Sequence, residues 1–469
     1  MRDLCEAAVD AAVGAGATYA DARIVVRRDQ RVSTRNRKVD DVTDTETAGI
    51  GVRVLVGGAW GFASTRDLGA ARDTALSAVA FASASPGRHD RTLAPVEAAT
   101  GTWRGPVEID PLTVSVDDKV AHLLRAEEAM RHESVTVTEA VTFARRQQKW
   151  FASSEGSALE QESYECGAGI DATAVGEGGH QIRSYPSQHG GTTALGGWEV
   201  VLGLDLEAAA PRIAEQAAAL LRADPCPAMV TTVVIDSDQM QSQVHESVGH
   251  PTELDRVLGA EAAYAGTSFL KRSDEGSLRY GSPLMHVTSD ATTPGGLGTF
   301  GWDDEGVPAR KQDIVREGVL VGWTDSRELG GGGSMRADGW SRMPLVRMTN
   351  LHLEPGSGSF EELLDGVEEG VYLETNRSWS IDDKRLNFQF GTQIAWEIVN
   401  GRLGRMLRDA SYTGVTPQFW ATLDAVAGPE EWRLGGLTNC GKGQPGQAAH
   451  VSHGASPCRF RDVRVGVTA

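Results

Sequence analysis

The chain of 469 residues lacks several features that would assign it to a protein class at once. It has no run of about 18 apolar residues, so we expect no transmembrane helix and no membrane partner. Its first residues carry acids and form no apolar signal core, so we expect a cytoplasmic protein. The five cysteines are scattered and odd in number, which argues against a disulfide framework.

Basic residues are also scarce. Lys and Arg number 45 against 64 Asp and Glu, which gives a formal net charge of −19. Nucleic-acid binding requires Lys and Arg to neutralise phosphates, so we expect no nucleic-acid partner. Segment 23–38 is a local exception, with seven basic residues and one acid. We interpret it as the solvated face of a hairpin, and the alternative is a docking edge for an acidic partner.

Glycine, by contrast, is abundant at 55 residues, which is typical of a chain rich in strands and loops. Apolar residues at helical spacing predict helices over residues 4–12, 70–82, 116–132 and 206–221. Alternating residues predict strands over 22–28, 31–39, 135–146, 149–153 and 167–175. A hairpin over 49–63 should turn at Gly57-Gly58. Residues 84–114 contain four prolines and indicate a long surface connection.

This order of hairpins followed by helices predicts an α+β fold. The length favours two to four domains, and the segment Asp224-Pro225-Cys226-Pro227 marks the first credible boundary. We therefore predict an N-terminal α+β domain of β-hairpins and helices over residues 1–224. A larger, β-rich C-terminal domain over residues 225–469 should carry the helix with the motif described next.

That motif is His245-Glu246-Ser247-Val248-Gly249-His250. Two imidazoles and a carboxylate are what a metal-dependent hydrolase needs: two nitrogen ligands and a base for metal-bound water. The histidines are five residues apart, about 140° around an ideal helix. An undistorted helix cannot aim both rings at one ion, so the helix must end between them or be distorted.

The surrounding residues favour an ending. Asp236 and Gln239 are spaced as a capping box that opens a helix. Gly249 weakens the helix, and Pro251 disfavours the α conformation for His250. We therefore expect the helix to break before His250. The competing interpretation is a solvated helix end with two incidental histidines.

A catalytic zinc usually takes a third protein ligand. The candidates are His286, His352, His450, His453, Cys440, Cys458 and several acids. Among them we favour Cys440, because glycines around it let the backbone approach closely and Lys442 would favour a thiolate. A thiolate with two imidazoles is a donor set that suits Zn2+. The alternative for either cysteine is a buried thiol that only packs.

In this motif and in several other segments the chain resembles the TldD/PmbA family of metalloproteases, also described as modulators of DNA gyrase. Residues 245–255 are similar to the family's HExxGHxxExD stretch, and residues 298–306 to its DDEG segment. Residues 344–350 resemble its PRMTN segment, and residues 439–442 its late cysteine motif. The resemblance covers nearly the whole chain, and Pro251 departs from the expected pattern.

The resemblance implies that His245, His250 and Cys440 are zinc ligands and that Glu246 is the general base. It also implies a peptidase that cleaves unfolded proteins or peptide precursors, including those of peptide antibiotics. Members dimerise, so we expect a homodimer or a heterodimer with a PmbA/TldE-like paralogue that lacks the motif. The alternative function is a non-catalytic subunit that binds a peptide or a partner protein.

Overall fold

The first half of the chain is built on four long antiparallel strands. The computed structural model describes residues 1–85, 91–177, 179–188 and 190–466. The long strands are β1 (Tyr19–Arg35), β2 (Lys38–Val56), β5 (Val135–Ser153) and β6 (Ala158–Gly176). The predicted strands were shorter, because polar stretches interrupt the apolar alternation. Ion pairs across neighbouring strands keep these stretches in the sheet, as between Arg145 Nε and Asp29 Oδ1 at 2.5 Å.

Shorter strands extend this sheet in the order β3-β2-β1-β5-β6-β4, and β7 and β8 also pair with β6. They are β3 (Ala59–Thr65), β4 (Thr100–Arg104), β7 (Gly179–Tyr185) and β8 (Thr192–Leu195). The hairpin turn at Gly57-Gly58 is confirmed, with φ values of 55° and 79° that glycine adopts without strain. The prediction that residues 84–114 form only a surface connection is wrong, because β4 lies within them and pairs in parallel with β6. Residues 86–90 of that connection lie outside the described part.

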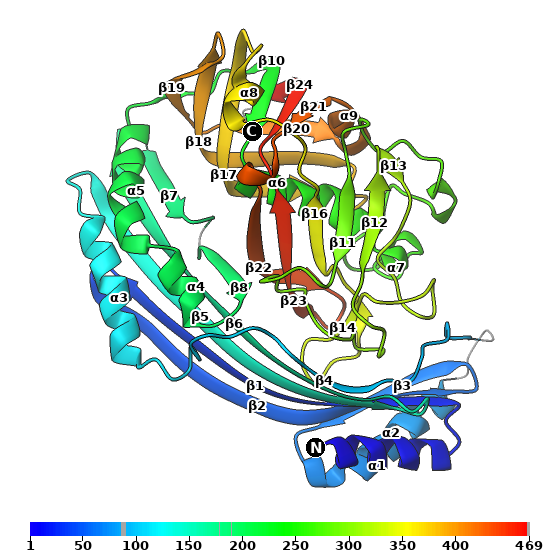
Figure 1. Ribbon diagram of the computed structural model, residues 1–469. Helices are drawn as coiled ribbons and strands as arrows, with labels where there is room; N and C mark the ends of the chain where they lie inside the picture. Colours follow the sequence, from blue (N-terminus) through cyan, green and yellow to red (C-terminus); the bar gives the residue numbers. More distant parts are fainter. Residues whose placement is uncertain (86–90, 178, 189, 467–469) are drawn as a thin grey trace.

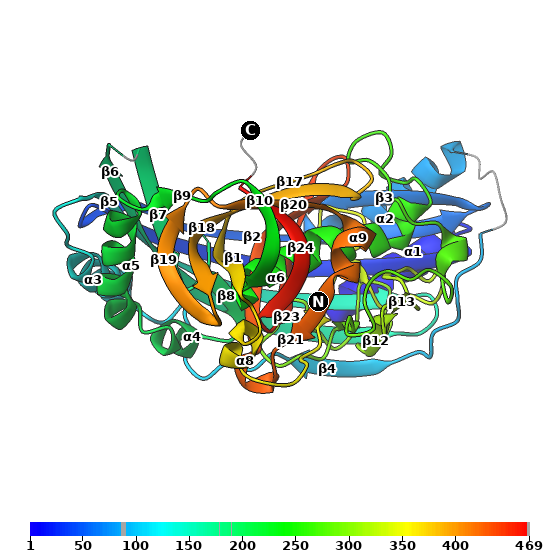
Figure 2. The same cartoon turned by 90° about the horizontal axis from the view of Figure 1, so that it is seen from above.

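Two groups of alanine-rich helices cover opposite ends of the curved sheet (Figures 1 and 2). Helices α1 (Arg2–Gly14) and α2 (Ala71–Ala84) lie at one end, and α3 (Val116–Ala129) and α5 (Leu206–Leu220) at the other. All four were predicted, and the short helix α4 (Trp198–Gly203) was not. Small side chains allow close packing: a Cβ on Gly61 of β3 would lie 2.2 Å from the Ala78 carbonyl oxygen of α2. No helix in the described ranges is long and apolar enough to cross a membrane.

The second half of the chain is rich in strands and lies against the concave side of the long sheet (Figure 1). One sheet contains β9 (Asp224–Pro225), β10 (Met229–Ile235), β17 (Glu369–Ile381), β18 (Asn387–Val399), β19 (Arg402–Arg408), β20 (Ser411–Val415), β21 (Leu423–Val426) and β24 (Cys458–Val465). A second sheet has the order β13-β12-β11-β16-β23-β22. Its strands are β11 (Val287–Asp290), β12 (Lys311–Arg316), β13 (Val319–Leu320), β16 (Asn350–Leu353), β22 (Arg433–Lys442) and β23 (Gln447–Ala455). Strands β14 (Met335–Arg336) and β15 (Leu345–Val346) form a two-stranded sheet.

The helices of this half are short. They are α6 (Ser237–Val244), α7 (Leu254–Val257), α8 (Phe360–Leu364) and α9 (Thr416–Ala421), with single 3-10 turns at His250–Thr252, Arg272–Asp274 and Pro429–Glu431. A further 3-10 turn, Leu68–Ala70, precedes α2 in the first half. The apolar side of α6 packs into the large C-terminal core through Met240 and Val244. The predicted α+β fold is therefore confirmed. A domain boundary after residue 224 stays a prediction.

A buried layer of charge joins the long sheet to the C-terminal half. Arg53 contacts Asp21 at 2.7 Å within the sheet and Glu305 at 3.1 Å across the interface, and all three side chains are buried. Lys149 reaches Asp304 at 2.7 Å. Arg23 is buried too and donates to main-chain carbonyls near residue 340. Segment 23–38 is therefore not wholly a solvated hairpin face, because part of it docks the protein's own C-terminal half.

Candidate metal centre

Helix α6 carries the first part of the site. Asp236 accepts a hydrogen bond from the Gln239 N–H at 2.8 Å, which confirms the predicted cap of the helix. The Gln239 side chain does not complete a capping box but donates to the Tyr412 hydroxyl at 2.8 Å. Val244 and, beyond the helix, Val248 are fully buried. This apolar stripe fixes the rotation of α6 and with it the direction of the histidines.

The expected break before His250 does not occur. The chain instead widens into a π turn over His245–Gly249, and the His250 N–H donates to the His245 carbonyl. A bond between residues five apart stacks His250 over His245, so both rings reach the same side. The five-residue spacing is thus resolved by distortion of the helix, which was the other possibility.

Two hydroxyl side chains, one distant and one adjacent in sequence, accommodate Pro251. His250 keeps helical angles, φ −62° and ψ −42°, although a following proline disfavours them. Proline has no N–H to give to a preceding carbonyl, and its ring crowds that position. The Tyr280 hydroxyl donates to the Ser247 carbonyl at 2.5 Å, and Thr252 Oγ1 donates to the Val248 carbonyl at 2.7 Å. These two hydroxyls satisfy the carbonyls that the widened helix leaves open.

Gly249 is required for packing rather than for an unusual backbone. Its φ of −59° is one that any residue adopts. A Cβ at this position would lie 2.1 Å from Met348 Sδ, well inside van der Waals contact. The glycine therefore lets the π turn approach the chain that precedes β16.

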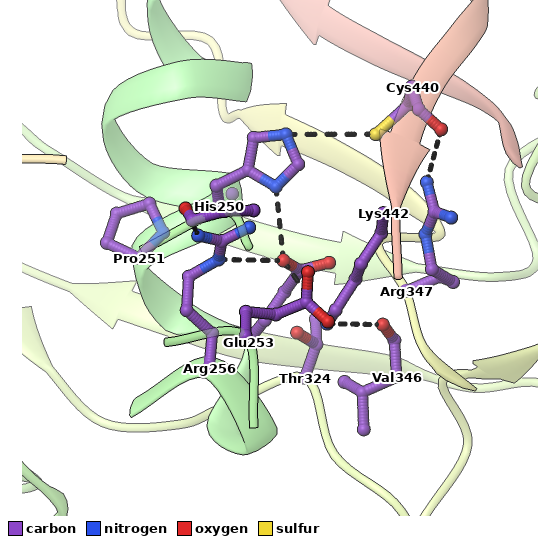
Figure 3. Close-up of polar contacts among 12 residues, drawn as sticks. His250, Pro251, Glu253, Arg256, Thr324, Val346, Arg347, Cys440 and Lys442 are labelled. Atoms are coloured by element: carbon purple, nitrogen blue, oxygen red, sulfur yellow. Dashed lines mark hydrogen bonds and ion pairs between the residues drawn. The ribbon is translucent and has the colours of Figure 1, made fainter. Parts of the chain in front are cut away.

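Three predicted ligands meet at this turn. One potential ligand atom from each of His245, His250 and Cys440 lies within 4.8 Å of the others, and all three residues are buried. His250 Nε2 lies 3.8 Å from Cys440 Sγ (Figure 3). A tetrahedral zinc with ordinary bond lengths would hold such a nitrogen and sulfur about 3.6 Å apart. The donor set and the spacing of His250 and Cys440 therefore fit a zinc ion.

His250 is held by a charged cluster (Figure 3). Its Nδ1 lies 3.1 Å from Glu253 Oε2, and the same oxygen lies 3.4 Å from Lys442 Nζ and 3.5 Å from Arg256 Nε. Burial raises the pKa of Glu253, but Lys442 and then His250 bring that pKa well below its ordinary value. An ionised Glu253 accepts the Nδ1–H of His250, so the nitrogen that can lose its proton to bind a metal is Nε2, which faces Cys440.

His245 is held by a neutral chain instead. Its Nδ1 lies 2.7 Å from His453 Nε2, and His453 Nδ1 lies 3.1 Å from the Leu351 carbonyl oxygen. A carbonyl only accepts, so His453 Nδ1 carries a proton, and its Nε2 accepts from His245. Burial lowers the pKa of both histidines, which keeps them neutral. His245 Nε2 is thus also left as an acceptor.

Cys440 differs from the other cysteines. Burial raises the pKa of its thiol, but His250, followed by Arg347, brings the net pKa below the ordinary value. Burial raises the pKa of Cys458, the rejected candidate. Lys442, which was predicted to favour the thiolate, is bound through Nζ to Asp255 at 2.7 Å and is not among the largest influences on the Cys440 pKa. Arg347 takes that place and donates to the Cys440 carbonyl.

Glu246 and the three candidate ligands line a cavity of about 340 Å³. Its other walls include the glycine-rich part of β22 and the turn that joins β17 to β18. Glu246 Oε2 accepts from Arg385 Nη1 of that turn at 2.9 Å. Glu246 Oε1 makes no hydrogen bond to the described residues, so it can accept a proton from a molecule in the cavity.

The remaining candidates lie elsewhere. His286 contacts Asp313, and His450 contacts Glu165 at 2.5 Å in the interface layer. His352 accepts from the Gly454 N–H at 2.8 Å. His453, also a candidate ligand, hydrogen-bonds to His245 beside the cavity instead. No local signal in the sequence distinguished Arg385, because the turn reaches Glu246 only through the tertiary fold.

An α+β fold with a His-His-Cys group and an adjacent carboxylate defines a metallopeptidase type of site. Comparison with known proteins gives the family. The PmbA/TldA metallopeptidase domain 1 matches residues 20–84, its central domain residues 109–223, and its C-terminal domain residues 228–466. The chain belongs to the PmbA/TldD family of metallopeptidases and is a peptidase.

Relatives and solved structures agree with this assignment. A metalloprotease of Methanocaldococcus jannaschii is 30% identical over 458 residues, which cover 94% of this chain and 95% of the relative. A zinc metalloprotease TldD homolog of Saccharolobus solfataricus is 26% identical over 47% of this chain and 48% of its own. TldE from Thermococcus kodakarensis has the same fold, with a TM-score of 0.73 at 14% identity over 98% of this chain and 99% of its own. A proposed modulator of a DNA gyrase from Thermotoga maritima has a TM-score of 0.75 at 17% identity over 99% of each chain.

Proposed function

We propose that this peptidase is zinc-dependent and cleaves unfolded proteins or peptide precursors, with His245, His250 and Cys440 as metal ligands and Glu246 as general base. One observation carries the proposal: the three ligand atoms lie within 4.8 Å of one another in a cavity that Glu246 also lines. The zinc metalloprotease name of the Saccharolobus solfataricus relative supports the choice of metal.

The reaction adds water to a peptide bond, breaks the C–N bond and yields a carboxylate and an amine. A bound zinc ion would polarise the scissile carbonyl and make the water more acidic. Glu246 Oε1 takes a proton from the attacking water and passes it to the leaving amine. The fixed tautomers of His245 and His250 keep both Nε2 atoms available as ligands. Both protons of the water end on the leaving nitrogen, one through Glu246 and one from the new carboxyl group, so a carboxylate and an ammonium group form and atoms and charge balance.

The cavity favours an extended substrate. Strand β22 is at the edge of its sheet and lines the cavity with residues 435–441. An edge strand can hold a peptide through main-chain hydrogen bonds, with little dependence on side chains. A folded protein offers few segments in that conformation, so unfolded chains and precursors are the substrates we propose.

The test compares matched pairs of variants. Glu246→Ala should abolish cleavage of an unfolded protein such as reduced casein and leave about one zinc per chain. Cys440→Ala should lose zinc and activity, whereas Cys458→Ala, which removes a buried thiol outside the site, should keep both. Metal is measured by mass spectrometry. Cleavage by Glu246→Ala would contradict the role of Glu246.

We also propose that the active form is a dimer, with a second copy or a TldE-like paralogue. The shared fold with TldE supports this proposal. Native mass of the purified chain, alone and with a TldE-like protein, measures it. A monomer with less than about a tenth of an equivalent of metal and no activation by zinc would favour the non-catalytic subunit instead.

A further inference from the structure

The metal-centre cavity contains a single permanent cation. Among the described residues that line it, Arg385 is the one Arg or Lys side chain, and Glu246 and Asp238 are the two acids. Arg385 is largely buried, with a side chain 16% exposed. A guanidinium taken out of water is costly, and one contact with a carboxylate satisfies only part of its donors. The cost of burying this charge suggests that Arg385 interacts with a ligand of the cavity.

The backbone holds Arg385 rigidly. Its φ of 60° lies in the left-handed region, which costs energy for a residue with a Cβ. The Arg385 N–H donates to the Asp382 carbonyl at 2.8 Å, and Thr416 Oγ1 donates to the Arg385 carbonyl at 2.9 Å. The preceding carbonyls of Asp383 and Lys384 accept from the loop around residues 267–269. The turn is therefore fixed from both sides before any substrate arrives.

The Arg385 guanidinium has N–H groups that are not hydrogen-bonded within the described part of the chain. Nη1 is bound to Glu246 Oε2 at 2.9 Å, whereas Nε is buried and has no acceptor among the described residues. A buried donor without an acceptor is uncommon and costly. A planar fork with one side occupied can still offer its other N–H groups to a second oxygen.

We propose that Arg385 is a further catalytic residue that donates hydrogen bonds to the oxygen of the scissile carbonyl as it becomes negative, and to the carboxylate of the product. This inference rests on the proposed function. Glu246 takes the proton of a water that attacks the carbonyl carbon, so a group in contact with Glu246 lies beside that carbonyl. A fixed donor at the developing charge accelerates the reaction.

The first experiment measures binding without turnover. In the full-length, zinc-loaded Glu246→Gln protein, calorimetry compares acetyl-trialanine ending in a carboxylate with the same peptide ending in an amide. Arg385→Gln should reduce the preference for the carboxylate by about 10- to 100-fold, because a charge-assisted hydrogen bond is lost. Zinc is common to both proteins, so its contribution to the preference cancels. Arg385→Lys should keep part of the preference.

A matched control separates this effect from general loss of charge. Arg377 lies in β17 of the same hairpin but pairs with Asp409 at 2.8 Å and does not line the cavity. Arg377→Gln should leave the preference unchanged. The proposal would be overturned if Arg385→Gln kept the same preference for the carboxylate as the Glu246→Gln protein, with its circular dichroism spectrum and zinc content unchanged. A residue that only positions Glu246 would not alter this ratio.

The second experiment uses kinetics with Glu246 intact. Arg385→Gln should lower kcat by about 10²- to 10³-fold with little change in KM. An inactive parent protein with an Arg385-dependent preference would support the anion site and refute the proposed function. An active parent whose preference and kcat do not depend on Arg385 would refute the role of Arg385 alone.

Discussion

The two histidines of the metal centre are supported in opposite ways. His245 ends a neutral chain that runs through His453 to the Leu351 carbonyl. His250 ends a charged cluster in which Glu253 faces Lys442 and Arg256. Both arrangements leave Nε2 of the histidine as an acceptor. The same tautomer can thus be fixed by dipoles or by charges.

The difference lies in what each arrangement contributes to stability. The neutral chain needs only burial and hydrogen-bond direction. The charged cluster is balanced: Glu253 and Asp255 face Lys442 and Arg256, so it adds no net charge beside the ligands. A balanced cluster depends on every member, because a lone buried charge is far more costly than a pair. The His250 side should therefore be the more fragile to substitution.

The largest effect should follow Glu253→Ala. It leaves Lys442 without one of its acid partners and Arg256 without the nearby carboxylate, both in a buried setting. Breaking such a pair costs about 3–5 kcal/mol. Urea unfolding of the metal-free protein should show this loss of unfolding free energy. A loss below about 1 kcal/mol would mean that the charged cluster is solvated and that it is no more sensitive to substitution than the neutral chain at His245.

As pH falls from 6.5 to about 4.5, the neutral chain of His245 and His453 should lose stabilising free energy before the charged cluster around Glu253 does. Burial lowers the pKa of His245 and brings that of His453 well below 6.5, so both groups bind a proton less readily when folded. Below pH 6.5 the unfolded chain binds protons that the folded chain does not, and the unfolding free energy falls with pH. A histidine that stays neutral in the folded chain contributes at most about 1.4 kcal/mol per pH unit. Glu253, whose pKa is lowered, loses its contribution only as pH falls below about 4.5.

Metal-free protein and its His453→Gln variant, unfolded in urea from pH 6.5 to 4.5, measure this slope. The variant should have a slope smaller by about 1.4 kcal/mol per pH unit over the acid part of the range. Equal slopes would show that His453 titrates normally.

Local chemistry made part of the fold and site predictable. The alanine spacing of α2 and α5 and the Asp236 cap act within one turn, so the sequence reveals them. The glycines around Cys440 indicated the correct cysteine of the cluster. The long strands were not predictable, because partners across the sheet hold their polar middle. The strand in 100–104 lacked apolar alternation for the same reason.

The π turn could not be derived from its own residues. One of its open carbonyls, that of Ser247, is satisfied by Tyr280, 33 residues away, and its approach to Met348 depends on the absence of a side chain at Gly249. His453 is 208 residues from His245, and Arg385 is 139 residues from Glu246. Each of these contacts is made by the packing of α6 between sheets, which no local pattern encodes.

The smallest effect should be on metal affinity when the neutral chain is cut. His453→Ala removes the acceptor of His245 Nδ1–H, so the ring can rotate or change tautomer. Loss of such a supporting partner costs about 10- to 100-fold in affinity, or about 1.4–2.7 kcal/mol. His453→Gln keeps an oxygen that can accept and should recover part of the loss. Competition with a zinc-selective chelator measures the zinc affinity of both variants and of Glu253→Gln. Glu253→Gln should bind zinc more weakly than either His453 variant, because it removes a charge that raises the basicity of His250. An affinity of His453→Ala equal to that of the parent would show that the charged side alone orients the site.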